Sequence, residues 1–111
     1  MLKDFILWQK AEDLVEYLFP IVDRFPKHEK FALCSEIKNL CYDMMKGIIR
    51  TNKMRNKTQG IYELDTQIEM LRWFVRHSHK RRYLADRSYE TTAKKVDEIG
   101  RIIGGLIKGG V

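Results

Sequence analysis

The clearest folding signal in the chain is IYELDTQIEMLRWFVRHSHK, residues 61–80. Its apolar residues recur at spacings of three and four, which is the period of one buried helix face. They are Ile61, Leu64, Ile68, Leu71 and Val75. Arg72, Arg76 and His79 share a second face, about a quarter turn from this stripe. The stretch is therefore predicted to form an amphipathic helix with a basic side.

Three further segments repeat this apolar period, and residues 52–60 and 81–86 interrupt it around the first stretch. The apolar stripes of these three segments are Leu7, Ala11, Leu14, Val15, Leu18, Val22 and Phe25; Leu33, Cys34, Ile37, Leu40, Cys41, Met44 and Ile48; and Tyr89, Thr92, Val96, Ile99, Ile103 and Leu106. Strand signals are almost absent and the connections are short. The sequence predicts one all-α domain, residues 1–111, folded as an antiparallel up-down-up-down four-helix bundle.

Pro20 interrupts the first stripe. Its nitrogen has no hydrogen to donate to the Glu16 carbonyl, so a kink is expected there unless the helix restarts. The run Phe25-Pro26-Lys27 is expected to end this segment.

Cys34 and Cys41 are seven residues apart on one predicted helix. At a rise of 1.5 Å per residue their Cα atoms lie roughly 10 Å apart, too far for a disulfide. We expect reduced core thiols, which fit the cytoplasm. The opening residues lack the apolar run of a secretory signal, and no stretch approaches the length of a membrane span.

Positive charge is concentrated in the middle of the chain. Residues 1–37 carry a net charge of −2, residues 38–82 carry +7, and residues 83–111 carry +1. No acidic residue lies between Glu69 and Asp86. Such a field attracts phosphate or an acidic protein surface. The alternative is that long basic side chains are simply solvated near a helix end.

We expect nucleic-acid contacts from ten basic residues. They are Lys46, Arg50, Lys53, Arg55, Lys57, Arg72, Arg76, Lys80, Arg81 and Arg82. Because the connections on either side of residues 61–80 lie at opposite ends of an up-down bundle, these residues form either a band along it or two patches. Phosphate contacts carry little sequence information, so weak sequence preference is expected, with RNA and DNA both open.

Small residues form a narrow strip on the last predicted helix. Ala93, Gly100 and Gly104 share it, beside Asp97. A strip without side chains lets another backbone approach closely, either within the bundle or from a neighbouring subunit. The alternative is a frayed C-terminus, although Ile103 and Leu106 keep the apolar period.

Catalytic, cofactor and metal-binding patterns are not evident. Both cysteines lie on an apolar stripe, and the glycines follow no strand as a phosphate-binding loop requires. His77 and His79 lack carboxylate or thiolate partners at metal-binding spacing. We expect partly exposed imidazoles, no cofactor, no metal and no enzymatic activity.

Several runs resemble the accessory variability determinant (Avd) proteins of diversity-generating retroelements. They are residues 24–27 (RFPK), 71–72 (LR), 81–84 (RRYL), 89–90 (YE) and 97–105 (DEIGRIIGG). Residues 7–11 (LWQKA) are also similar to the wider four-helix family that includes proteins encoded in ribosomal RNA intervening sequences, the S23 type.

The Avd resemblance implies a non-enzymatic accessory subunit that assembles as a pentameric barrel. It also implies binding of nucleic acid and of the retroelement's reverse transcriptase, with Arg72, Arg76, Arg81 and Arg82 at similar basic positions. One residue departs from the family pattern: Ala85 stands where a hydroxyl residue often caps the last helix, so Asp86 is expected to cap instead. The second functional class is an oligomeric S23-like interaction protein whose basic surface docks an acidic protein.

Overall fold

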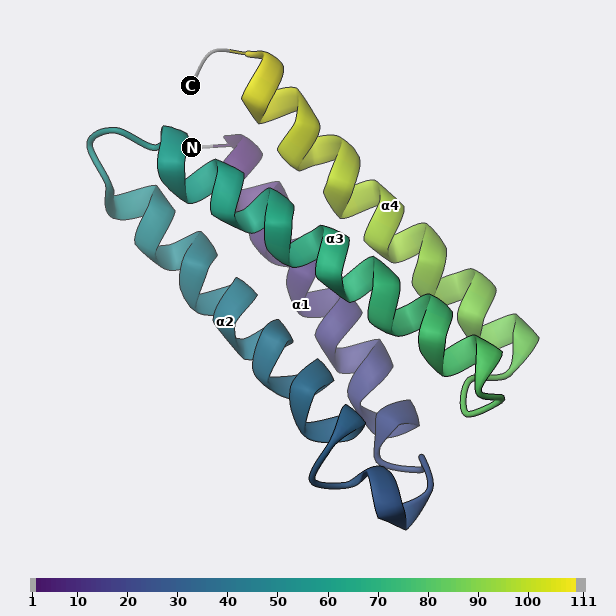
Figure 1. The fold of residues 1–111 in the computed structure, drawn as a ribbon. Helices are drawn as coiled ribbons and strands as arrows, with labels where there is room; N and C mark the ends of the chain where they lie inside the picture. Colours follow the sequence, from purple (N-terminus) through teal and green to yellow (C-terminus); the bar gives the residue numbers. More distant parts are fainter. Residues whose placement is uncertain (1, 110–111) are drawn as a thin grey trace.

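Four long antiparallel helices make up the computed structural model, which describes residues 2–109 (Figure 1). They are α1 (Leu2–Val22), α2 (Leu33–Lys53), α3 (Thr58–Lys80) and α4 (Asp86–Lys108), with the short 3-10 helix η1 (Lys27–Glu29) between α1 and α2. No strand occurs in the described range. The all-α, four-helix prediction is confirmed.

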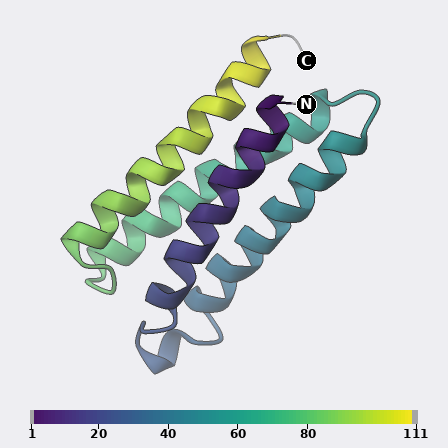
Figure 2. The ribbon, with the colours of Figure 1, turned by 180° about the vertical axis from the view of Figure 1, so that it is seen from behind.

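Each helix packs against two neighbours, in the cyclic order α1, α2, α3, α4. The view from behind shows α1 and α4 side by side, with the start of α1 and the end of α4 at the same end of the bundle (Figure 2). The predicted stripes meet in one core, in which Leu40 and Tyr89 are only partly buried. The core also takes in Phe74 and Leu84, which lie outside the predicted stripes.

Helix α1 continues through Pro20 and ends two residues later, at Val22. The helix does not restart, because Pro20 already lies in its last turn. The missing N–H removes one bond to the Glu16 carbonyl. A bend of the helix axis at Pro20 stays a prediction.

The expected capping of α4 by Asp86 is wrong. Asp86 is the first helical residue and Ala85 is the N-cap, with no side-chain capping bond. The Asp86 carboxylate instead lies 2.7 Å from Nε2 of His79. A capping side chain belongs to the residue before the helix, and an alanine there offers none.

Both cysteines are buried on α2 as free thiols, as predicted. Burial raises the pKa of the Cys41 thiol to about 12. Burial, followed by the negative charge of Glu29, also raises the pKa of Cys34. No helix in residues 2–109 combines the length and apolar character needed to cross a bilayer.

Helices α2 and α3 pack tightly together where Gly60 faces Thr51. A methyl carbon added at Gly60 would lie 2.9 Å from Thr51 Cγ2. Thr51 is buried, and its β-branched side chain has few alternative rotamers.

Replacing Gly60 with alanine is expected to lower the free energy of unfolding by about 1–2 kcal/mol. Overpacking against Thr51 then outweighs the gain in helix propensity. Gly105→Ala is the matched control, because nothing among the described residues lies within 4 Å of an added methyl carbon there. We expect it to be neutral or stabilising by up to about 1 kcal/mol. Urea unfolding followed by circular dichroism measures both, and equal stability of the two variants would contradict the prediction.

Candidate nucleic-acid interface

The ten predicted basic residues are spread along two helices and two connections. Lys46, Arg50 and Lys53 lie on α2; Arg55 and Lys57 between α2 and α3; Arg72, Arg76 and Lys80 on α3; and Arg81 and Arg82 between α3 and α4. The two connections lie at opposite ends of the bundle (Figure 1). The ten residues therefore do not converge on one compact site, and α3 is the element that runs between the two ends.

Arg72 is held by contacts within the bundle. Its guanidinium is ion-paired with Glu69 on the same helix, and its Nη2 lies 3.2 Å from the Asp97 carboxylate on α4. The same group covers Gly100, where an added methyl carbon would lie 2.9 Å from Nη2. Much of the Arg72 charge is thus offset by two carboxylates before any ligand arrives.

The small-residue strip on α4 is covered by another side chain at one position and open at another. Ala93, Gly100 and Gly104 are all half-buried. Arg72 covers the strip at Gly100, whereas nothing in the described part of the chain lies within 4 Å of a methyl carbon added at Gly104. Helix α4 continues past these glycines to Lys108.

Lys57 closes the C-terminal end of α2. Its Nζ donates to the carbonyl oxygens of Asn52 and Met54, both at 2.8 Å, and to that of Thr51 at 3.3 Å. Thr51 and Asn52 lie in the last turn of α2 and Met54 is its C-cap. Most carbonyls at a helix C-terminus lack an intrahelical donor, and the helix dipole favours a cation there. The arrangement suits a helix cap.

Seven of the ten residues are exposed and form no ion pair or side-chain hydrogen bond with other described residues. They are Lys46, Arg50, Lys53, Arg55, Arg76, Lys80 and Arg82. Their charges are available to a partner. We call these seven the exposed cations.

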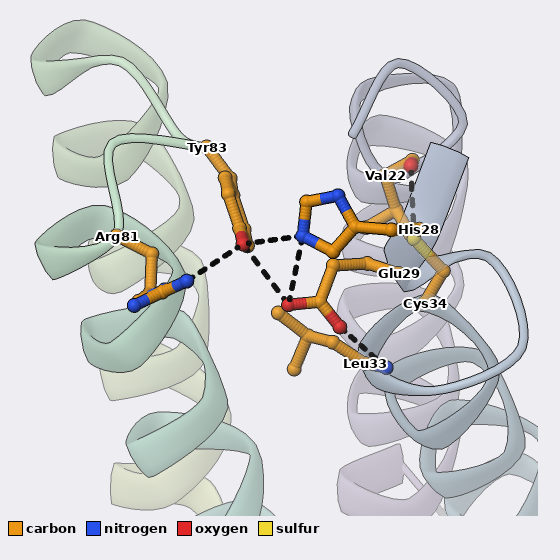
Figure 3. Close-up of polar contacts among 7 residues, drawn as sticks. All are labelled: Val22, His28, Glu29, Leu33, Cys34, Arg81 and Tyr83. Carbon is orange, nitrogen blue, oxygen red and sulfur yellow. Dashed lines mark hydrogen bonds and ion pairs between the residues drawn. The ribbon is translucent and has the colours of Figure 1, made fainter. Parts of the chain in front are cut away.

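A polar cluster centred on Tyr83 fixes the turn between α3 and α4 (Figure 3). The Tyr83 hydroxyl donates to Glu29 Oε2 at 3.0 Å and accepts from Arg81 Nη2 at 3.4 Å. The Nε2 atom of His28 lies 3.3 Å from the same hydroxyl. The pKa of Arg81 is raised mainly by its hydrogen bond to Tyr83 and secondly by the charge of the Tyr83 side chain.

This cluster joins the α3–α4 turn to η1, more than fifty residues earlier in the chain. The Tyr83 ring also packs on Phe25, with the ring centroids 5.5 Å apart. Within the turn, Arg82 has a φ of 64°, in the left-handed region. Sequence reasoning missed Tyr83, His28 and Glu29, because neutral and acidic residues carry no signal in a search for basic patches.

The two histidines of α3 are half-buried and stacked on aromatic rings. His79 stacks on Tyr89 with ring centroids 4.1 Å apart, and His77 stacks on Trp73 at 4.7 Å. His79 also contacts Asp86 on α4. No group of metal-binding side chains occurs among residues 5–109. Helix α3 also carries the exposed apolar side chains of Tyr62, Met70 and Trp73.

Comparison with known proteins agrees with the resemblance in the sequence. The family model described as bAvd-like matches residues 5–109. No curated protein matches the chain. Because the family match covers almost the whole chain, the protein belongs to the bAvd-like family.

Proposed function

We propose that the protein is a non-enzymatic accessory subunit of a diversity-generating retroelement, acting in the cytoplasm. The observation that carries the proposal is the match to the bAvd-like family over residues 5–109. In this role the protein binds RNA or DNA and associates with the element's reverse transcriptase. The reverse transcriptase makes the mutated cDNA, and the accessory subunit holds the template and the enzyme together.

The exposed cations support the nucleic-acid part of this proposal. Each is a long side chain that can reach a phosphate without first breaking an ion pair within residues 5–109. Phosphate contacts fix position on a strand and carry no sequence information directly. Binding is therefore expected to be weakly sequence-specific and to fall steeply with salt.

A pull-down tests the role directly. The tagged protein is expected to retain the reverse transcriptase encoded beside it, both before and after nuclease treatment. Retention lost only after nuclease would show that nucleic acid bridges the two proteins. Failure to retain the enzyme under either condition would contradict the proposed partnership.

We also propose that the subunits assemble as a pentameric ring. Glu12 and Glu16 are exposed on α1 and form no ion pair within the described residues, whereas Asp23, which follows α1, pairs with Lys38. A ring joins two different surfaces of neighbouring subunits, so an acidic face can meet a basic one. Light scattering after size exclusion at moderate salt reports the mass, and a monomer at tens of micromolar would contradict the ring.

A further inference from the structure

A half-open cavity lies at the end of the bundle where α1 passes through η1 into α2. Its volume is about 500 Å³, within the range of ligand-binding pockets. Val22, Phe25, Phe31 and Tyr42 contribute apolar lining. None of the ten basic candidate residues lines it.

The charged side chains that line this cavity favour a negative group. Its charged lining residues are Lys27, Lys30, Lys38 and Asp23. Lys38 is ion-paired with Asp23, while Lys27 and Lys30 form no ion pair in residues 5–109. The lining therefore has an excess of two positive charges, both on exposed side chains at the entrance to α2.

Phe31 gives the cavity an apolar edge that faces water. Its side chain is 88% exposed, the largest exposed fraction among the large apolar residues in the described part of the chain. It lies between η1 and α2, with Lys30 Nζ 5.4 Å from the centre of its ring. A phenyl ring left in water forgoes the free energy of burial, which an apolar occupant of the cavity would recover.

We propose that this cavity binds a polypeptide segment in which an apolar side chain is flanked by carboxylates. The apolar side chain enters between Phe25, Phe31 and Tyr42. The carboxylates pair with Lys27 and Lys30 at the rim. The site is distinct from the exposed cations, so one subunit can hold an acidic protein segment and nucleic acid at the same time.

Charge and lining favour a polypeptide over a nucleic acid at this position. A nucleic acid brings one phosphate after another, but only Lys27 and Lys30 among the charged lining residues form no ion pair in residues 5–109, and Asp23 also lines the cavity. Two unpaired lysines match one or two carboxylates on a short segment. The apolar lining matches an aliphatic or aromatic side chain and offers no run of cations to follow a phosphate backbone.

Fluorescence anisotropy with a labelled peptide tests the proposal. The probe carries a central Leu-Phe pair flanked by Glu and Asp, and two control peptides replace either the Leu-Phe pair with serines or the acids with lysines. We expect each control peptide to bind at least about tenfold more weakly, because each loses one of the two interactions. Amide chemical shifts of the labelled protein should change at Ser35 and Asn39, which line the cavity, and not at Arg50.

Two variants of the protein separate the cavity from the general positive charge. Lys27→Glu with Lys30→Glu is expected to weaken binding of the probe at least about tenfold. The control, Lys94→Glu with Lys108→Glu, changes the net charge equally at exposed positions of α4 that do not line the cavity and should stay within about twofold. Ser35→Phe, which introduces a phenyl ring at the lining of the cavity, should also weaken binding.

Three results would overturn the proposal: no binding of the probe to the unaltered protein, equal binding of the serine control peptide, or equal losses in the two double variants. A single-stranded oligonucleotide whose affinity falls with the cavity variants would assign the site to nucleic acid instead. Failure here leaves the proposed retroelement function standing, because that function is tested by the pull-down and by residues outside the cavity.

Discussion

Replacing five exposed cations with glutamine is expected to lower the affinity for nucleic acid at least about 100-fold at low salt. The five are Lys46, Arg50 and Lys53 on α2, and Arg76 and Lys80 on α3. Each charge that meets a phosphate steepens the log–log dependence of affinity on salt by roughly 0.7 to 0.9. The variant should therefore show a shallower salt dependence, similarly for unrelated sequences. Filter binding from low to moderate salt measures both quantities, and circular dichroism should show unchanged helix content.

A variant of α4 that loses four positive charges controls for most of this change in net charge. Arg87, Lys94, Arg101 and Lys108 are also exposed and form no ion pair with other described residues. Neutralising these four should reduce affinity and salt dependence much less. Equal losses in the two variants would mean that binding follows overall charge and not the α2–α3 surface. Unchanged affinity in the five-residue variant would favour the alternative function, in which the basic surface docks an acidic protein.

Arg72 illustrates that a basic residue in the sequence is not always a cation that is free to bind a ligand. The sequence places it with Arg76, one helical turn away on α3. The bundle brings Asp97 of α4 beside it, twenty-five residues later in the chain, and leaves Arg76 exposed. This partner could not be predicted, because a helical period assigns a face and does not fix which residue of the next helix lies opposite.

The helical core was predictable because burial follows the apolar period closely. Two residues of the hydrophobic core in the described part of the chain lie outside the predicted stripes, and the position of each explains why. Phe74 lies next to the stripe of α3 and is buried. Leu84 lies in a connection that the sequence presents as a break, and the Tyr83 cluster holds that connection against η1.

The ends of the helices were less predictable than their cores. In the sequence Lys57 looks like one more cation of a basic loop, yet its Nζ donates to the carbonyls of Thr51 and Asn52 in α2 and of the C-cap Met54. Asp86 reads as a cap, yet it bonds His79. In both cases the path of the turn determines which group the side chain contacts. Turns lack the periodicity from which helices are predicted in a sequence.

Gly104→Leu is expected to disrupt the proposed ring while leaving the single subunit at least as stable. An added methyl carbon at Gly104 has nothing within 4 Å among the described residues, so the isolated bundle accommodates it. Leucine is also the better helix former, by up to about 1 kcal/mol. If a neighbouring subunit approaches the strip closely, a leucine there holds the two backbones apart. Light scattering should then report a smaller mass, with thermal unfolding at or above that of the unaltered protein.

Gly105→Leu supplies the control for that experiment. Gly105 lies next to Gly104 on α4, is likewise open in the isolated subunit, and lies off the strip shared with Ala93. The same substitution there should leave the mass unchanged. Gly100 is unsuitable as a control, because a side chain there meets Arg72 of its own chain. A ring that survives Gly104→Leu would place the subunit contact elsewhere. A lower unfolding temperature for Gly104→Leu, without any change in mass, would show that the strip packs within the subunit.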